Sequence, residues 1–88
     1  MNRCFIMGKI VTKPQFDFLY MSSRVSVSHF LLELSNKTKI KTLGFDDVAD
    51  YIYQELKEGD LITIEGELRS TDTHKTLEIE ILTITKAV

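Results

Sequence analysis

The residues of this chain best placed to do chemistry are three lysines spaced two apart, Lys37, Lys39 and Lys41. The run from residue 37 to residue 43 alternates in the manner of a β-strand, so the three side chains should share one face. Three like charges in a row repel one another unless an anion lies over them. Two interpretations stand: a solvated edge strand whose lysines prevent aggregation, or a rail for a phosphate backbone.

A second group of candidates is aromatic. Phe16, Phe18 and Tyr20 follow at period two in the extended segment 15–21. Side chains in this pattern either pack into a core or form a platform for unpaired bases, where each stack contributes about 1–3 kcal/mol. We expect Phe16 in the core and Tyr20 exposed, because Tyr20 adjoins the polar turn that ends at Arg24. Phe18 and Tyr20 are therefore the candidate stacking residues.

The charge of the chain is unevenly distributed. The net charge is −2, which by itself argues weakly against a nucleic-acid partner. Residues 1–45, however, carry seven basic and two acidic side chains, whereas residues 46–88 carry four basic and eleven acidic ones. This asymmetry favours an anionic partner for one surface.

The sequence offers little for catalysis. His29 and His74 have no neighbouring pattern of a metal site or a catalytic triad, and no glycine-rich phosphate loop is present. We expect no enzyme activity, no cofactor and no metal. The single cysteine, Cys4, lies in an apolar run and is expected to be a buried thiol in a reducing cytoplasm. No membrane span or signal peptide is recognised, so the protein should be cytoplasmic.

The periodicity predicts one mainly β domain over residues 1–88. A helix should follow Asp46 or Asp47, either of which can cap it, and end before Gly59, which suits a left-handed position. Its apolar stripe would consist of Val48, Ile52 and Leu56. Strands are predicted at Arg3–Val11, Val25–Ser35, Lys37–Leu43, Leu61–Ser70 and Leu77–Thr85.

Two details of the predicted strands carry further expectations. Gly66 interrupts the apolar face of the fourth strand, which indicates a bend, a bulge or a close backbone approach. In the last strand the apolar phase slips between Ile81 and Leu82, which predicts a β-bulge. In the first strand, Phe5 and Met7 lie opposite the core face, so either they cap the barrel core or a subunit or base covers them.

Three strands, a helix and two strands form the order of a five-stranded OB-fold barrel, with the helix between strands 3 and 4. Several segments, in order and spacing, resemble the bacterial single-stranded DNA-binding protein family. The most specific is the helix end, turn and strand that finishes Ile-Glu-Gly-Glu-Leu-Arg at residues 64–69. The others are Met1-Asn2-Arg3, Ile6 to Ile10, Lys13-Pro14-Gln15, Ser28 to Leu34 and Leu43-Gly44.

This resemblance implies a non-enzymatic barrel that binds single-stranded DNA or RNA without sequence specificity, forms a homodimer or tetramer, and acts in DNA replication, repair or recombination. The chain departs from the family pattern by having no tryptophan, a shortened last hairpin and no acidic tail after Val88. In this respect it is similar to the primosomal replication protein B branch, whose members bind through basic residues and dock onto replication proteins.

The residues expected to contact nucleic acid are those with a basic or stacking side chain near the presumed ligand face. They are Lys13, Phe18, Tyr20, Arg24, Lys37, Lys39, Lys41, Arg69 and Lys75. We expect the lysines and the aromatic residues to meet on one concave wall free of acidic side chains. The alternative is a protein-interaction module of a replication complex that kept the fold and has weak or lost nucleic-acid binding.

Overall fold

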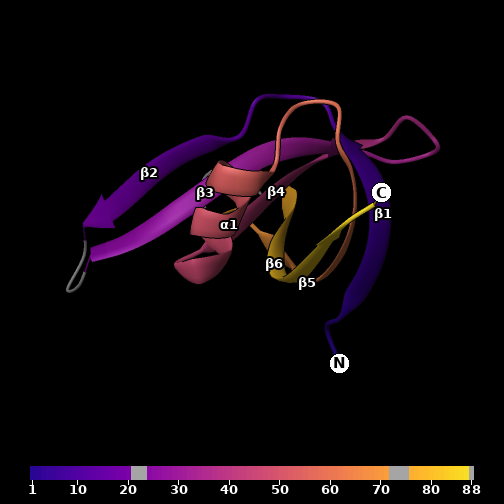
Figure 1. Ribbon diagram of the computed structural model, residues 1–88. Helices are drawn as coiled ribbons and strands as arrows, with labels where there is room; N and C mark the ends of the chain where they lie inside the picture. Colours follow the sequence, from indigo (N-terminus) through magenta and orange to yellow (C-terminus); the bar gives the residue numbers. More distant parts are fainter. Residues whose placement is uncertain (21–23, 72–75, 88) are drawn as a thin grey trace.

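The computed structural model describes residues 1–20, 24–71 and 76–87, and within these ranges the chain forms six strands and one helix (Figure 1). The elements follow the predicted order closely, since most boundaries fall within two residues of those read from the sequence. They are β1 (Cys4–Ile10), β2 (Gln15–Tyr20), β3 (Arg24–Glu33), β4 (Lys39–Phe45), α1 (Asp47–Glu55), β5 (Leu61–Ser70) and β6 (Leu77–Lys86).

Five of the strands close into a barrel. The sheet runs in the order β1-β5-β6-β4-β3, and β3 returns to β1 through the pairs Lys9↔Glu33 and Ile10↔Leu32. The neighbours in the ring are antiparallel except β4 and β6, which are parallel. Because α1 lies between the third and fourth barrel strands, the structure confirms the predicted OB-fold.

The extended segment with the aromatic residues is a sixth strand rather than a loop. β2 pairs with the first half of β3 from Gln15↔His29 to Tyr20↔Arg24. β3 is long enough to pair with two strands along one edge, because its first half pairs with β2 and its last two residues pair with β1. The β2–β3 hairpin consequently extends well beyond the barrel, at the left of Figure 1.

The core lies inside the barrel and is closed by the helix. Strand residues with alternate spacing meet there, and Ile52 and Leu56 of α1 complete the cluster, as the apolar stripe predicts. Cys4 is half-buried and packs against this cluster rather than lying fully inside it. The strand members of the core are Ile10, Phe30, Leu32, Ile62, Ile64, Ile79 and Ile81.

The ends of α1 agree with the sequence in part. Asp46 is the residue before the first helical turn, but its side chain makes no capping hydrogen bond. Its φ of 53° is unusual for a residue other than glycine, and it turns the chain from β4 into the helix. Beyond the helix, Gly59 has a φ of 98°, which confirms the left-handed position expected for it.

The glycine in β5 marks both a bulge and a close backbone approach. Glu65 pairs with Thr83 but Gly66 pairs with Ile81, so Leu82 is the extra residue in β6. This confirms the bulge expected between Ile81 and Leu82. A Cβ on Gly66 would meet the backbone oxygen of Glu80 and lie 2.8 Å from a methyl carbon of Ile79.

Two apolar side chains of β1 point away from the core. Phe5 is 74% exposed and Met7 is 65% exposed. They therefore do not cap the barrel core, which leaves their covering by a second molecule as the remaining interpretation. Among the described ranges 1–20, 24–71 and 76–87, no helix combines the length and apolar character required to cross a bilayer.

We predict that Gly66→Ala destabilises the protein by about 1–3 kcal/mol, because the methyl group must displace the backbone of β6. The melting temperature should fall by about 4–8 °C for each kcal/mol lost. Thermal unfolding followed by circular dichroism measures this. Ser70→Ala, at an exposed position of the same strand, is the matched control and should melt with the wild type. A Gly66→Ala variant as stable as the wild type would contradict the close approach.

Candidate nucleic-acid interface

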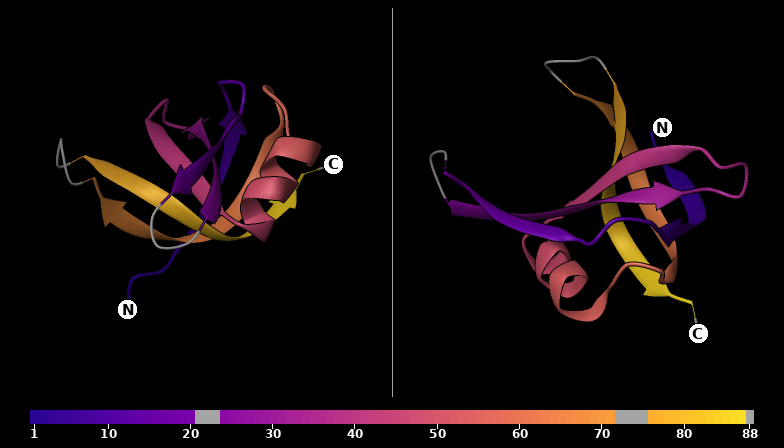
Figure 2. Two further views of the ribbon diagram at one scale, coloured as in Figure 1. Left: turned by 90° about the vertical axis from the view of Figure 1, so that its left-hand side faces the viewer. Right: turned by 90° about the horizontal axis from the view of Figure 1, so that it is seen from above.

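The candidate interface is the outer face of β2, β3 and β4. Figure 2 shows the β2–β3 and β5–β6 hairpins leaving the barrel in different directions, with α1 on the opposite side of the β2–β3 hairpin from β5–β6. Phe30 and Thr42, paired across β3 and β4, point into the barrel, so their neighbours His29 and Lys41 point outward. The outer face is thus enclosed between the two hairpins.

A depression of about 280 Å³ lies on this face. Its wall is apolar, with Leu43 and Phe45 of β4 beside Val27 of β3. Its polar groups come from all five strands that surround it. They are Asp17, His29, Lys41, Arg69 and Glu78.

A second depression, of about 320 Å³, adjoins the first and shares His29 and Lys41 with it. Lys13 lies at its far side, in the connection from β1 to β2. This connection is fixed against β3, since the Leu31 amide donates to the Thr12 hydroxyl at 2.9 Å and the Val11 amide donates to the Leu31 carbonyl at 3.0 Å. The two depressions form one groove, with Arg69 at one end, Lys41 in the middle and Lys13 at the other end.

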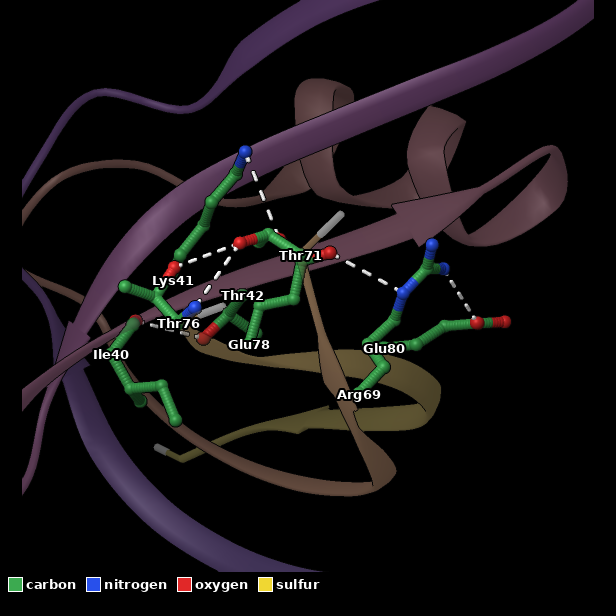
Figure 3. A network of polar contacts seen from close by, with 8 residues as sticks. All are labelled: Ile40, Lys41, Thr42, Arg69, Thr71, Thr76, Glu78 and Glu80. Atoms are coloured by element: carbon green, nitrogen blue, oxygen red, sulfur yellow. Dashed lines mark hydrogen bonds and ion pairs between the residues drawn. The ribbon is translucent and has the colours of Figure 1, made fainter. Parts of the chain in front are cut away.

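An ion-pair network crosses the floor of the groove (Figure 3). The Glu78 carboxylate lies 3.3 Å from Nε of Arg69 and 3.8 Å from Nζ of Lys41. Nη1 of Arg69 donates to Glu80 at 3.1 Å. The guanidinium of Arg69 also lies over the ring of Phe45, 5.8 Å from its centroid, in a cation–π arrangement. Strand register produces these contacts, because Glu78 pairs with Lys41 in β4 and with Arg69 in β5.

His29 lies at the centre of the groove and is half-buried. Desolvation lowers its pKa below the ordinary value of 6.5, and the positive charge of Lys41 lowers the pKa further. The carboxylates of Asp17 and Glu78 act in the opposite direction and are the weaker influences. The imidazole is therefore mainly neutral at pH 7, which leaves it able to accept a hydrogen bond at one nitrogen and donate at the other.

The structure separates the three lysines of the predicted rail. Lys39 and Lys41 share the outer face of β4. Lys37 precedes the strand, in a turn where its amide donates to the Leu34 carbonyl at 2.9 Å and its φ is 70°. It lines a different depression, beside Met7 and Leu61. The alternation did not extend to Lys37 because the connection between β3 and β4 covers residues 34–38, whereas the predicted strands left only residue 36 between them.

Phe16 and Phe18 of β2 lie on the opposite face from the groove. Phe16 packs edge-on against Phe18, with ring centroids 5.2 Å apart, and equally close to Tyr53 of α1. Asp17 and Leu19, which alternate with them, line the groove instead. The structure does not bring Phe18 together with the lysines. The strand pairing places Tyr20 and Arg24 opposite each other, but their side chains, like Lys75, lie outside the described residues.

Several groove residues escaped the sequence prediction, among them His29, Phe45, Asp17 and Glu78. Phe45 continues the alternation of Lys39, Lys41 and Leu43, and extending the predicted strand by two residues would have found it. Asp17 and Glu78 place carboxylates in a wall that was expected to be free of them. Alternation along β2 could have placed Asp17, whereas Glu78 depended on the parallel pairing of β4 with β6, which no local pattern reveals.

The described residues contain no group of three or more His, Cys, Asp or Glu side chains arranged to hold a metal ion.

Comparison with known proteins places the fold. No protein-family model matches the chain, and no curated protein does. Solved structures do match. A single-stranded DNA-binding (SSB) domain from Synechococcus sp. superimposes with a TM-score of 0.85 at 21% identity, over 96% of this chain and 93% of that domain. The chain has the SSB fold.

Two further SSB structures support this result. Wild-type single-stranded DNA binding protein from Thermus aquaticus matches with a TM-score of 0.84 at 19% identity, over all of this chain but only 41% of that protein. The second SSB of Mycobacterium smegmatis matches at 0.80 and 16% identity, over 97% of this chain and 87% of that one. All three are named for DNA binding rather than for an enzyme activity.

We predict that acid weakens the fold through His29. Folding lowers the pKa of His29 below the ordinary value of 6.5. Above pH 6.5 the histidine is mainly neutral in both states and costs no stability. As the pH falls below 6.5, the unfolded chain binds the proton more readily than the folded protein does, so the free energy of unfolding decreases. His29→Gln should therefore lose less stability than the wild type between about pH 7.5 and about pH 5.5. Urea unfolding at both values measures this. Equal losses in the two proteins would contradict it.

Proposed function

We propose that this protein binds single-stranded DNA, with little sequence preference, in the groove over β3 and β4. The observation that carries the proposal is the row formed by Arg69, Lys41 and Lys13 beside the apolar wall of Leu43 and Phe45. In OB-folds the second and third barrel strands and the first and last hairpin loops form the usual oligonucleotide surface. β3 and β4 are those strands here, and the groove lies on them.

The groove supplies the two interactions that a single strand requires. The cations meet the phosphates, which are identical for every nucleotide, and so give affinity without sequence preference. The apolar wall accepts the faces of bases, and Phe45 is the aromatic side chain of this wall. Since few phosphates are neutralised, we expect modest affinity. The same contacts accept single-stranded RNA.

The wider proposal is a role in DNA replication, repair or recombination, in the cytoplasm, as a homodimer or tetramer that also contacts replication proteins. The primosomal replication protein B branch, which relies on basic residues, remains the predicted point of comparison within the SSB fold. The absence of tryptophan from the sequence supports this comparison.

Neutralising Lys41 of the groove together with Lys39, its neighbour on the outer face of β4, should weaken binding and flatten its dependence on salt. For Lys39→Gln with Lys41→Gln, the slope of log affinity against log salt should fall by up to about 0.7 for each lysine. Fluorescence anisotropy with a labelled dT oligonucleotide of about 16 nucleotides measures both quantities. Titrations at about 50 mM and about 200 mM salt give the slope.

The matched control for this experiment is Lys9→Gln with Lys86→Gln. Both lysines are exposed and line neither depression of the groove, and the net charge changes by the same amount. The control should bind like the wild type. A wild type that does not bind dT at low salt, or two double variants that weaken equally, would overturn the proposed site.

A protein-interaction module is the second candidate function. Two observations favour it: the carboxylates of Asp17 and Glu78 in the groove, and the exposed side chains of Phe5 and Met7 on β1. Leu61 of β5, which is 52% exposed, borders the same surface. If β1 is a contact between copies of this chain, the protein is an oligomer whether or not it binds DNA.

We predict that Phe5→Glu shifts the protein toward the monomer, because a carboxylate in an apolar contact must be desolvated without a partner. Size-exclusion chromatography with light scattering measures the mass. Tyr51→Glu, at an exposed aromatic residue of α1, is the control and should leave the mass unchanged. A wild-type monomer, or a Phe5→Glu variant of unchanged oligomeric mass, would contradict the role of this surface.

A further inference from the structure

Glu78 occupies an unusual position for a carboxylate. It belongs to β6, and its side chain is only 7% exposed. It is the one charged residue among those described in residues 1–20, 24–71 and 76–87 that is classed as buried. A buried carboxylate is costly unless cations or donors surround it. Lys41 and Arg69 provide that compensation.

The two cations that compensate Glu78 are those that the groove offers to a ligand. Lys41 is half exposed and the Arg69 side chain is 44% exposed, so both can reach an anion from the solvent side. Each nevertheless has a carboxylate within 4 Å. Arg69 is engaged twice, by Glu78 at Nε and by Glu80 at Nη1. One of its five donors is therefore hydrogen-bonded to Glu80, and Nε is within ion-pair distance of Glu78, before any ligand arrives.

A phosphate must compete with Glu78 for these cations. An ion pair with a buried carboxylate is screened by salt less than a pair in open solvent. The carboxylate of Glu78 also lies close to any phosphate that contacts Lys41 and Arg69, and the two negative charges repel each other. Both effects make the contribution of Lys41 and Arg69 to the free energy of binding a nucleic-acid backbone less favourable. Neither effect depends on base sequence.

We propose that Glu78 is an internal counter-ion that sets the affinity of the groove for nucleic acid, by holding Lys41 and Arg69 partly neutralised. This inference rests on the proposed single-strand binding site and names the residue that limits the affinity of that site. Phosphates of the bound strand contact the solvent side of each cation. Glu78 remains paired with the opposite side and holds both side chains in position.

Glu78→Gln tests the inference, since glutamine keeps the shape and removes the charge. The variant should bind a labelled dT oligonucleotide more tightly than the wild type, with the largest gain at low salt. The slope of log affinity against log salt should steepen by about 1.4, or about 0.7 for each cation released. Glu55→Gln, at an exposed position of α1, removes the same charge far from the groove and should bind like the wild type.

A second variant covers the event that Glu78→Gln does not fold by circular dichroism. Glu80→Gln removes one of the two carboxylates that engage Arg69, at a partly exposed contact, and leaves the Glu78 pairs in place. It should steepen the slope by no more than about 0.7. A folded Glu78→Gln protein with wild-type affinity and slope overturns the inference and leaves the binding site standing. A variant that binds while the wild type does not supports the inference and overturns the proposed function. Failure of both proteins to bind overturns both proposals.

Discussion

The double use of strand β3 is the constraint on which the rest of this structure depends. Along one edge β3 pairs with β4 from Val27 to Glu33. Along the other edge its first half pairs with β2, and its last two residues close the barrel against β1. Because side chains alternate between the two faces of a strand, this pairing determines which side chains of β3 point into the barrel and which point outward. Phe30 and Leu32 go to the core, while His29 goes to the outer face. The groove is a consequence of closing the barrel with so long a strand.

The charge distribution explains how an acidic chain can present a cationic groove, and why that groove is not strongly cationic. The basic first half of the sequence supplies β2, β3 and β4, and the acidic second half supplies α1, β5 and β6. Barrel closure joins the two halves, so Lys41 of β4 meets Glu78 of β6, and Arg3 near β1 meets Glu65 and Glu67 of β5. Basic side chains from the first half of the sequence are thereby partly neutralised by acidic side chains from the second half.

Local patterns predicted most of the fold and only part of the site. Alternation and the glycine at position 66 placed the strands and the bulge, because these depend on residues that are neighbours in the chain. Lys41 and Arg69, which were named as candidate contacts, both line the groove. The sequence pattern could not show that Phe18 packs against Phe16, which contacts Tyr53 of α1, because that depends on which face of β2 the helix covers. It could not show Glu78 either, since the parallel β4–β6 pairing arises only when the barrel closes.

The central claim is that nucleic acid lies over β3 and β4, and backbone amide chemical-shift mapping by NMR tests it most directly. Titration of the labelled protein with a dT oligonucleotide should shift the amides of His29, Lys41, Leu43 and Phe45, and leave those of Met7 and Ala49 unchanged. Shifts confined to β1 or α1, or no shifts at low salt, would contradict the account.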